Sequence, residues 1–103
     1  MGVMSTENAT PSITATVVLP RLGGGRHVAT ELVAAALAET PDAQAITFDA
    51  TATRAFAQGA TDELVKRSME HLGWENVDRL RLINATPLTT RYFRESIERR
   101  RPR

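Results

Sequence analysis

The sequence predicts a single α/β domain with a small, mostly parallel sheet and the order β-α-β-α-β-α. The chain has 103 residues, of which 42% are hydrophobic, enough for one compact core. Three short apolar segments alternate with three longer segments of helical periodicity. Such alternation gives parallel strands joined by right-handed crossovers. We expect the domain over 12–100, after a flexible polar leader (1–11) and before a basic tail (101–103).

Each predicted strand has its own pattern of side chains. Residues 13–19 (ITATVVL) are β-branched and apolar, and Pro20 ends this strand. Residues 45–48 (AITF) are short and mostly apolar, which predicts a central strand with helices on both faces. Residues 79–83 (RLRLI) alternate between polar and apolar, which is typical of a strand with one face in water.

The three helices are expected at 27–39, 58–72 and 88–100, where apolar residues recur at helical spacing. A proline-containing turn ends the first, Gly73 is predicted to end the second, and Thr86 is predicted to cap the third. The side chains expected to face the core are Val28, Leu32, Val33, Ala36 and Leu37 in the first helix, Ala60, Leu64, Val65, Met69 and Leu72 in the second, and Leu88, Tyr92, Phe93 and Ile97 in the third.

Composition argues against several classes of function. The chain has no cysteine, which excludes disulfides, thiolate metal sites and a cysteine nucleophile. Its longest apolar stretch, Leu32–Ala38, is far shorter than a membrane span, and its start lacks the pattern of a secretory signal. His27 and His71 lack metal-ligand spacing, and no Ser-His-Asp arrangement can be inferred. We therefore expect a cytoplasmic, non-enzymatic protein without cofactor, metal or membrane partner.

The expected site lies beyond the carboxyl ends of the strands, where open α/β sheets bind ligands. Three segments should meet there: 20–26, 49–59 and 84–87. A glycine-rich turn followed by a helix and an arginine can bind an anion through backbone N–H groups and the guanidinium. The residues of such an anion or nucleotide site would be Gly23, Gly24, Gly25 and Arg26, with Asp49 nearby. The alternative is a plain turn whose arginine pairs with an acid such as Asp49, because the motif lacks the lysine of a phosphate-binding loop.

Other polar residues near these segments have ordinary explanations as well. Thr51, Thr53 and Thr61 are candidate phosphoacceptors or turn caps. Asp62 and Glu63 lie in the first turns of a helix, where carboxylates complement the helix dipole.

The C-terminal segment 91–103 carries six arginines against two glutamates, while the remainder of the chain is mildly acidic. Several of these charges are four residues apart, as ordinary helix-surface pairs are. A solvated or partner-facing helix is therefore favoured over nucleic-acid binding, which usually needs a basic surface across the domain.

Short motifs along the chain suggest a family. Arg26 opens the first helix, an apolar strand ends in Asp49, the helix opening Thr61–Val65 (TDELV) is acidic and aliphatic, and a later strand ends in Asn84. With these features, Gly25–Arg100 resembles the STAS-like family of small bacterial domains of unknown function, which is related to the STAS domains of anti-sigma factor antagonists. An aromatic residue usually precedes the acidic motif in that family, and here the residue is alanine.

The resemblance implies a regulatory protein-interaction module, of the anti-sigma factor antagonist or partner-switch type. Its partner would be a regulatory protein such as a histidine-kinase-like ATPase. The partner-binding residues implied are Arg26, Asp49, Gln58, Gly59, Thr61, Asp62 and Glu63. Antagonists carry a phosphorylatable serine at the helix start, near Gln58 or Gly59 here, and neither residue can be phosphorylated. The alternative function is a small-anion or nucleotide-binding domain, and a homodimer and the strand order stay undecided.

Overall fold

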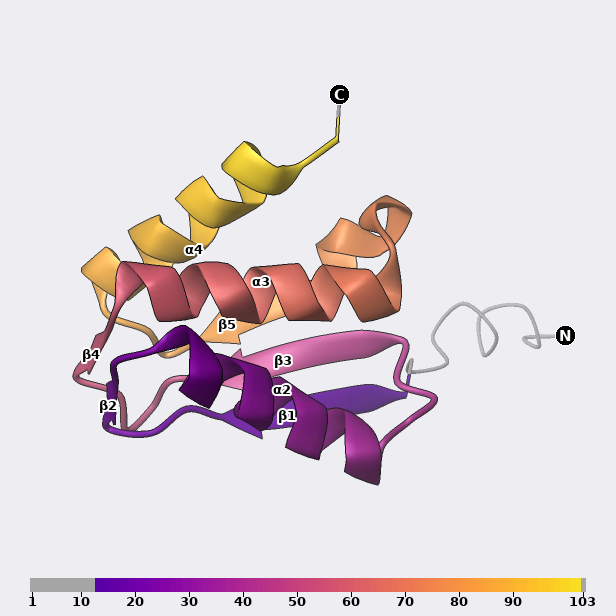
Figure 1. Cartoon of the computed structure of the whole chain (residues 1–103), viewed down its shortest axis with the longest axis horizontal. Helices are drawn as coiled ribbons and strands as arrows, with labels where there is room; N and C mark the ends of the chain where they lie inside the picture. The colour runs from indigo at the N-terminus through magenta and orange to yellow at the C-terminus, as the bar shows by residue number, and fades with distance from the viewer. Residues whose placement is uncertain (1–12, 103) are drawn as a thin grey trace, which may run out of the picture.

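A computed structural model describes residues 13–102. The leader expected over 1–11 lies outside the described residues. The elements in chain order are the strands and helices β1 (Thr14–Val18), β2 (Leu22–Gly23), α2 (Arg26–Glu39), β3 (Ala45–Asp49), β4 (Ala55–Phe56), α3 (Gln58–Leu72), the 3₁₀ helix η1 (Trp74–Arg79), β5 (Leu80–Ile83) and α4 (Pro87–Arg100) (Figure 1). The three main strands are parallel, in the order β1-β3-β5. The predicted α/β class and β-α-β-α-β-α order are confirmed.

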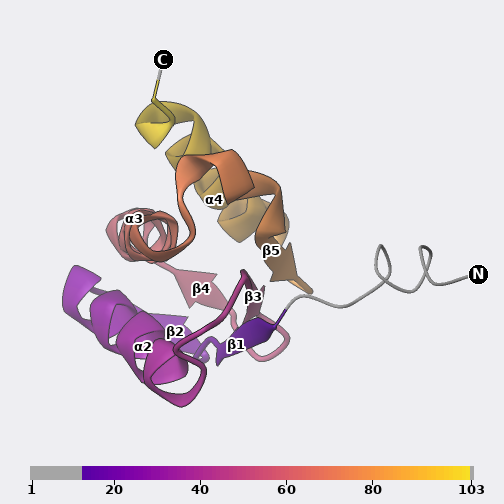
Figure 2. The ribbon, with the colours of Figure 1, turned by 90° about the vertical axis from the view of Figure 1, so that its right-hand side faces the viewer.

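The helices cover one face of this sheet (Figure 2). Ala15, Val17, Ile46 and Phe48 point into the core, while the alternate positions of β1 and β3 are exposed or half-buried. The strand 45–48 is central, as predicted, but the prediction that helices cover both of its faces is wrong. The reason lies in the segment itself, because its only two large apolar side chains are two residues apart and therefore point to the same side.

The buried helix faces agree with the sequence best for α3. All five of its predicted core residues are buried, and they pack with the sheet in one hydrophobic cluster. In α4, Phe93 is buried and its ring meets that of Phe48 edge-on, with 5.8 Å between centroids. Two predictions are wrong, since Val28 and Leu88 are exposed. Val28 is replaced in the core by its neighbour Ala29, and Leu88 lies in the first turn of α4.

The predicted helix ends are confirmed. Gly73 follows α3 with φ +85°, a left-handed conformation that glycine adopts without strain. The Thr86 hydroxyl caps α4 by accepting a hydrogen bond from the backbone N–H of Thr89 at 3.2 Å, and Pro87 opens the helix. The Thr86 cap therefore fixes the point at which the loop after β5 ends and α4 begins.

A short second pair of strands, which the sequence does not predict, lies beyond the carboxyl ends of the main strands. β2 pairs with β4 in parallel, Leu22 opposite Ala55 and Gly23 opposite Phe56. Gly23 is required by this pairing, because a Cβ atom at residue 23 would overlap the Phe56 ring. The pair holds the loops after β1 and β3 together and so shapes the end of the molecule where a ligand is expected.

Candidate functional site

A groove of about 730 Å³ lies at this end of the molecule. It is lined by residues 22–24, 54–58 and 86–89 and by Tyr92. These residues belong to the three segments that the sequence placed together, extended by the first turns of α4. The lining includes the buried Phe56 of β4, and its walls come from β2, the start of α3 and the start of α4. The sequence does not predict this contribution of α4, because helical spacing places Leu88 among the core residues of 88–100.

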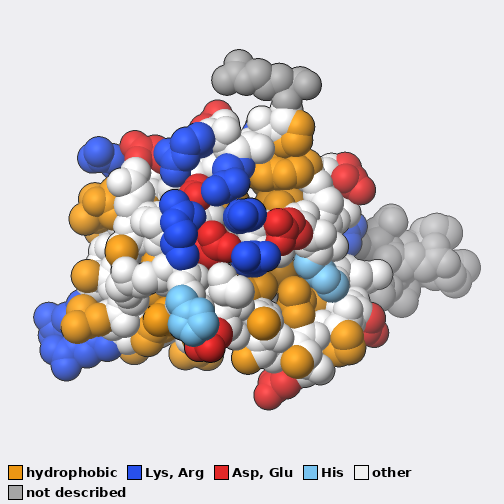
Figure 3. Space-filling model, viewed as in Figure 1, with side chains coloured by type: hydrophobic (Ala, Val, Ile, Leu, Met, Phe, Trp, Pro, Cys, Tyr) orange, Lys and Arg blue, Asp and Glu red, His pale blue; other side chains and the backbone are white. Residues whose placement is uncertain are grey.

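The groove is apolar and its edge is basic. Leu22 is 68% exposed and Leu88 is 52% exposed, and the two line the same hollow, so they expose apolar surface together. Arg54 is the one charged residue in the lining. Its backbone N–H donates to the Arg21 carbonyl at 2.8 Å, so the two arginines lie next to each other. Figure 3 shows basic and hydrophobic side chains side by side at the end of the molecule where β2 and β4 lie.

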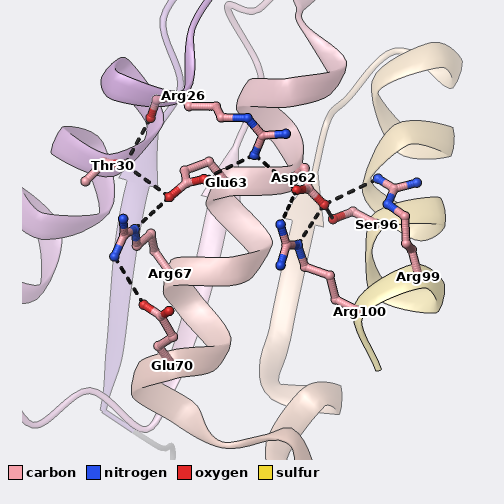
Figure 4. Close-up of polar contacts among 9 residues, drawn as sticks. All are labelled: Arg26, Thr30, Asp62, Glu63, Arg67, Glu70, Ser96, Arg99 and Arg100. Atoms are coloured by element: carbon pink, nitrogen blue, oxygen red, sulfur yellow. Dashed lines mark hydrogen bonds and ion pairs between the residues drawn. The ribbon is translucent and has the colours of Figure 1, made fainter. Parts of the chain in front are cut away.

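An ion cluster with two buried carboxylates lies on the faces that α2, α3 and α4 turn toward one another (Figure 4). Its centre is Asp62, whose side chain is only 5% exposed. Arg100 binds both carboxylate oxygens, with Nε donating to Oδ1 at 2.9 Å and Nη2 to Oδ2 at 2.6 Å. The buried Ser96 hydroxyl donates to Oδ1 at 2.7 Å, and Arg26 and Arg99 donate at 3.1 and 3.3 Å. Asp62 therefore joins all three helices.

Glu63 extends the cluster along α3. It accepts hydrogen bonds from Arg67 Nε at 2.7 Å, from Arg26 Nη1 at 3.2 Å and from the Thr30 hydroxyl at 3.4 Å. Arg26 thus bridges both carboxylates. The alternative in which Arg26 pairs with an acid is therefore confirmed, but the acids are Asp62 and Glu63 and not Asp49, because the first turn of α2 faces α3 rather than the end of β3.

The cluster keeps its carboxylates ionised. The two hydrogen bonds from Arg100 lower the pKa of Asp62 far below its ordinary value, against the opposing effect of burial, with Ser96 and Arg26 adding to the shift. Burial opposes the ionisation of Glu63, but hydrogen bonds from Arg67 and Arg26 outweigh it and the pKa of Glu63 is lowered. The bonds to Asp62 raise the pKa of both Arg26 and Arg100.

Asp49 belongs to a third polar group, which ties two loops together. Its Oδ1 accepts from the hydroxyl and the backbone N–H of Thr51, at 2.5 and 2.9 Å, and these bonds lower the pKa of Asp49. Asn84, whose φ of +59° turns the chain after β5, donates to the Thr51 hydroxyl at 2.9 Å. The strand-end residues of β3 and β5 are therefore brought together as the sequence predicted, in the geometry of a capped loop.

The remaining predicted site residues differ in accessibility. Gln58 is exposed and Gly59 half-buried at the start of α3, next to the groove and to the Arg26 side chain respectively. Thr61, Asp62 and Glu63 are buried, so their side chains cannot form a contact surface in this conformation. The Thr61 hydroxyl donates to the Ala57 carbonyl at 3.0 Å, and because Thr61 is buried a kinase could not reach it in this conformation.

The residues of the glycine-rich turn do not share one environment. Gly23 is buried beneath Phe56, while Gly24 and Gly25 have open space where a side chain would be. Arg26, which would have supplied the charge for an anion, is held by two carboxylates. These residues are adjacent in the chain but do not converge on one point.

Metal and acid–base chemistry find little support in these surroundings. Within residues 13–102, no three His, Asp or Glu side chains are grouped so that they could hold a metal ion. The groove lining contains no carboxylate and no histidine. His27 pairs with Glu31 at 3.1 Å on the surface, and His71 Nε2 lies 2.9 Å from the Ala43 carbonyl. Among the described helices, none has both the length and the apolar character needed to cross a bilayer.

Comparison with known proteins gives no relative. No family model, no curated protein and no solved structure matches this chain. The resemblance to the STAS-like family therefore depends on the short sequence motifs alone.

Proposed function

We propose that this protein is a non-enzymatic regulatory module that docks a partner protein in the groove at the carboxyl ends of its strands. The observation that carries the proposal is that two exposed leucines, Leu22 of β2 and Leu88 of α4, line the same apolar hollow. Clustered exposed apolar residues beside a concave surface are typical of protein-binding sites. The exposed Gln58 places the start of α3 on the same surface.

The surroundings of the groove suit docking better than catalysis. Docking requires a rigid frame, and the Asp62 cluster ties α3, which contributes one wall, to α4, which contributes another. Acid–base catalysis requires titratable groups at the reacting atoms, and the lining offers only the Tyr92 hydroxyl and the Arg54 guanidinium.

The partner class follows from the resemblance to anti-sigma factor antagonists. It would be a regulatory protein, of the histidine-kinase-like ATPase type or a sigma-regulatory protein. The buried Thr61 argues against control by phosphorylation at this residue, so the proposed docking is regulated elsewhere or by the amount of protein present.

Binding of an anion or nucleotide at the glycine-rich turn is the weaker alternative. Arg26 would have to leave Asp62 and Glu63 to reach a ligand at the turn. Thermal unfolding with nucleotides and inorganic phosphate tests it directly, because a ligand at a hundred times its Kd adds about 2.7 kcal/mol to the stability of the fold. An unchanged melting temperature across these ligands would eliminate this alternative.

The docking proposal is tested by site-specific photocrosslinking in the cells that make the protein. A photoreactive amino acid is placed at Gln58 or Leu88, and at Val18 as the control. Val18 is 66% exposed and lies on the open face of the sheet, away from the groove lining. We expect one regulatory protein to be captured at the first two positions and not at Val18. Capture of the same proteins at all three positions, or of none at any, would refute the proposal.

A further inference from the structure

We infer that the groove recognises a partner segment with large apolar side chains flanked by carboxylates. This inference rests on the proposed docking function and adds the chemistry of what is docked. It is carried by the arrangement of two features, an apolar hollow and two arginines at its edge that have no partner within the described part of the chain.

The apolar feature sets the size of the anchor. A volume of about 730 Å³ falls within the roughly 300–1,000 Å³ of pockets that enclose a ligand. Its large apolar side chains are the buried Phe56, the exposed Leu22 and Leu88, and the half-buried Tyr92. Side chains such as leucine and phenylalanine would remove these surfaces from water, which is the main source of affinity in such hollows.

The charges set what flanks the anchor. Five arginines of this chain, Arg26, Arg67, Arg91, Arg99 and Arg100, are paired with carboxylates of their own molecule. No hydrogen bond or ion pair joins the side chain of Arg21 or Arg54 to any residue among 13–102. The same holds for Arg81 and Arg94, but among these arginines only Arg54 lines the groove, and Arg21 is bonded to it through the backbone. Both are exposed, and the groove beside them contains no carboxylate. A partner that supplies Asp or Glu at this edge would complement the site, whereas one that supplies lysine would be repelled.

A peptide segment suits both features better than a nucleic acid does. Two arginines are a small basic surface, and the exposed leucines offer nothing to a phosphate backbone. The other exposed apolar residues do not form a comparable site, because Val18 and Ile83 share the open sheet face with threonines and Val28 lies on α2, outside the groove lining.

The test measures fluorescence anisotropy with three labelled nine-residue peptides. They share a core of two leucines and a phenylalanine and are flanked by aspartate, by serine or by lysine, and a labelled oligothymidine of nine nucleotides is the fourth probe. We expect the aspartate-flanked peptide to bind about tenfold more tightly than the serine-flanked one, the size of effect that two exposed ion pairs can produce. The preference should shrink at 1 M salt, where charges are screened within about 3 Å.

Matched variants locate the binding. Leu22→Ser should weaken the aspartate-flanked peptide about tenfold, while Val18→Ser, at nearly the same exposure, should leave it unchanged. Arg54→Glu should abolish the preference for aspartate, while Arg81→Glu, on the open sheet face, should not. All four positions are exposed, and circular dichroism verifies that each variant is folded.

The outcomes separate this inference from the docking proposal. Equal binding of the three peptides, lost in Leu22→Ser, overturns the acidic-flank inference and leaves docking intact. Stronger binding of the oligothymidine than of any peptide overturns the inference in favour of a nucleic-acid site. If no peptide binds but photocrosslinking still captures a partner in the groove, only the acidic-flank inference is overturned. If no peptide binds and no partner is captured, the inference and the docking proposal are both overturned.

Discussion

Replacing Asp62 by asparagine should destabilise the domain, because it removes the charge at the centre of the ion cluster. Not all of its contacts count equally. The Arg26 and Arg99 side chains are more than half exposed, and ion pairs of that kind are worth little. Arg100 is one-third exposed and binds both oxygens, and Ser96 is buried, so these two partners carry most of the stabilisation.

The magnitude follows from which bonds asparagine can keep. Its carbonyl oxygen can still accept from Ser96, but its amide N–H₂ group would face a nitrogen of Arg100 and lose at least one charge-assisted bond. Hydrogen bonds to charged groups contribute about 1.5–3 kcal/mol each. We therefore expect Asp62→Asn to lower the free energy of unfolding by about 2–3 kcal/mol, measured by urea denaturation at pH 7. Asp78→Asn, at an exposed position, should change it by less than about 0.5 kcal/mol.

The pH dependence gives a second readout of the same charge. The pKa of Asp62 is lower in the folded state than its ordinary value of 3.8, so its stabilisation is present in full well above that pH and is lost as the pH falls toward the folded-state pKa. The difference between the wild type and Asp62→Asn should be constant from about pH 8 to pH 5 and should shrink below about pH 4. A difference under 0.5 kcal/mol at pH 7, or one that stays constant down to pH 3, would refute this account of the cluster.

Three further changes test the frame around the groove by urea denaturation. Gly23→Ala should lower the free energy of unfolding by about 1–3 kcal/mol, since its methyl group would overlap the Phe56 ring. Gly24→Ala, with open space around it, should be neutral or stabilising by up to about 1 kcal/mol. Equal effects of the two substitutions would contradict the β2–β4 packing. Thr86→Ala should cost about 1 kcal/mol through loss of the α4 cap, and an unchanged stability would argue against that cap. Phe93→Leu should cost about 1–2 kcal/mol because the edge-on contact with Phe48 is lost, and a neutral effect would show that the ring pair contributes little.

The frame of this protein could be predicted because it depends on local patterns. The apolar spacing of 58–72 gave the buried face of α3 correctly, and Gly73 and Thr86 gave the ends of helices from the conformations those residues favour. Period-two alternation also fits the one-sided sheet, because Ile46 and Phe48 lie two residues apart within 45–48. In a segment of four residues, however, an alternating pattern is hard to distinguish from a continuous apolar run.

The polar contacts could not be predicted, because they join residues that are far apart in the chain. Asp62 and Arg100 are separated by 38 positions, and whether they meet depends on how α4 crosses α3. The same holds for the groove. Its three segments were expected to meet, but the wall carrying Leu88 exists only because the start of α4 stands beside β2 and β4. Spacing along one helix predicts pairs such as Arg91 with Glu95, which is present at 3.2 Å, and says nothing about neighbours on other helices.

The most direct test of docking is a calorimetric titration of the crosslinked partner, once purified, against two double variants. One carries Leu22→Ser and Leu88→Ser in the groove, and the other carries Val18→Ser and Ile83→Ser on the open sheet face, so that each loses two exposed apolar side chains. Docking in the groove predicts at least about a tenfold rise in Kd for the first pair and less than about a twofold change for the second. Equal losses in the two variants, or a loss confined to the sheet-face variant, would contradict the assignment of the groove as the docking surface.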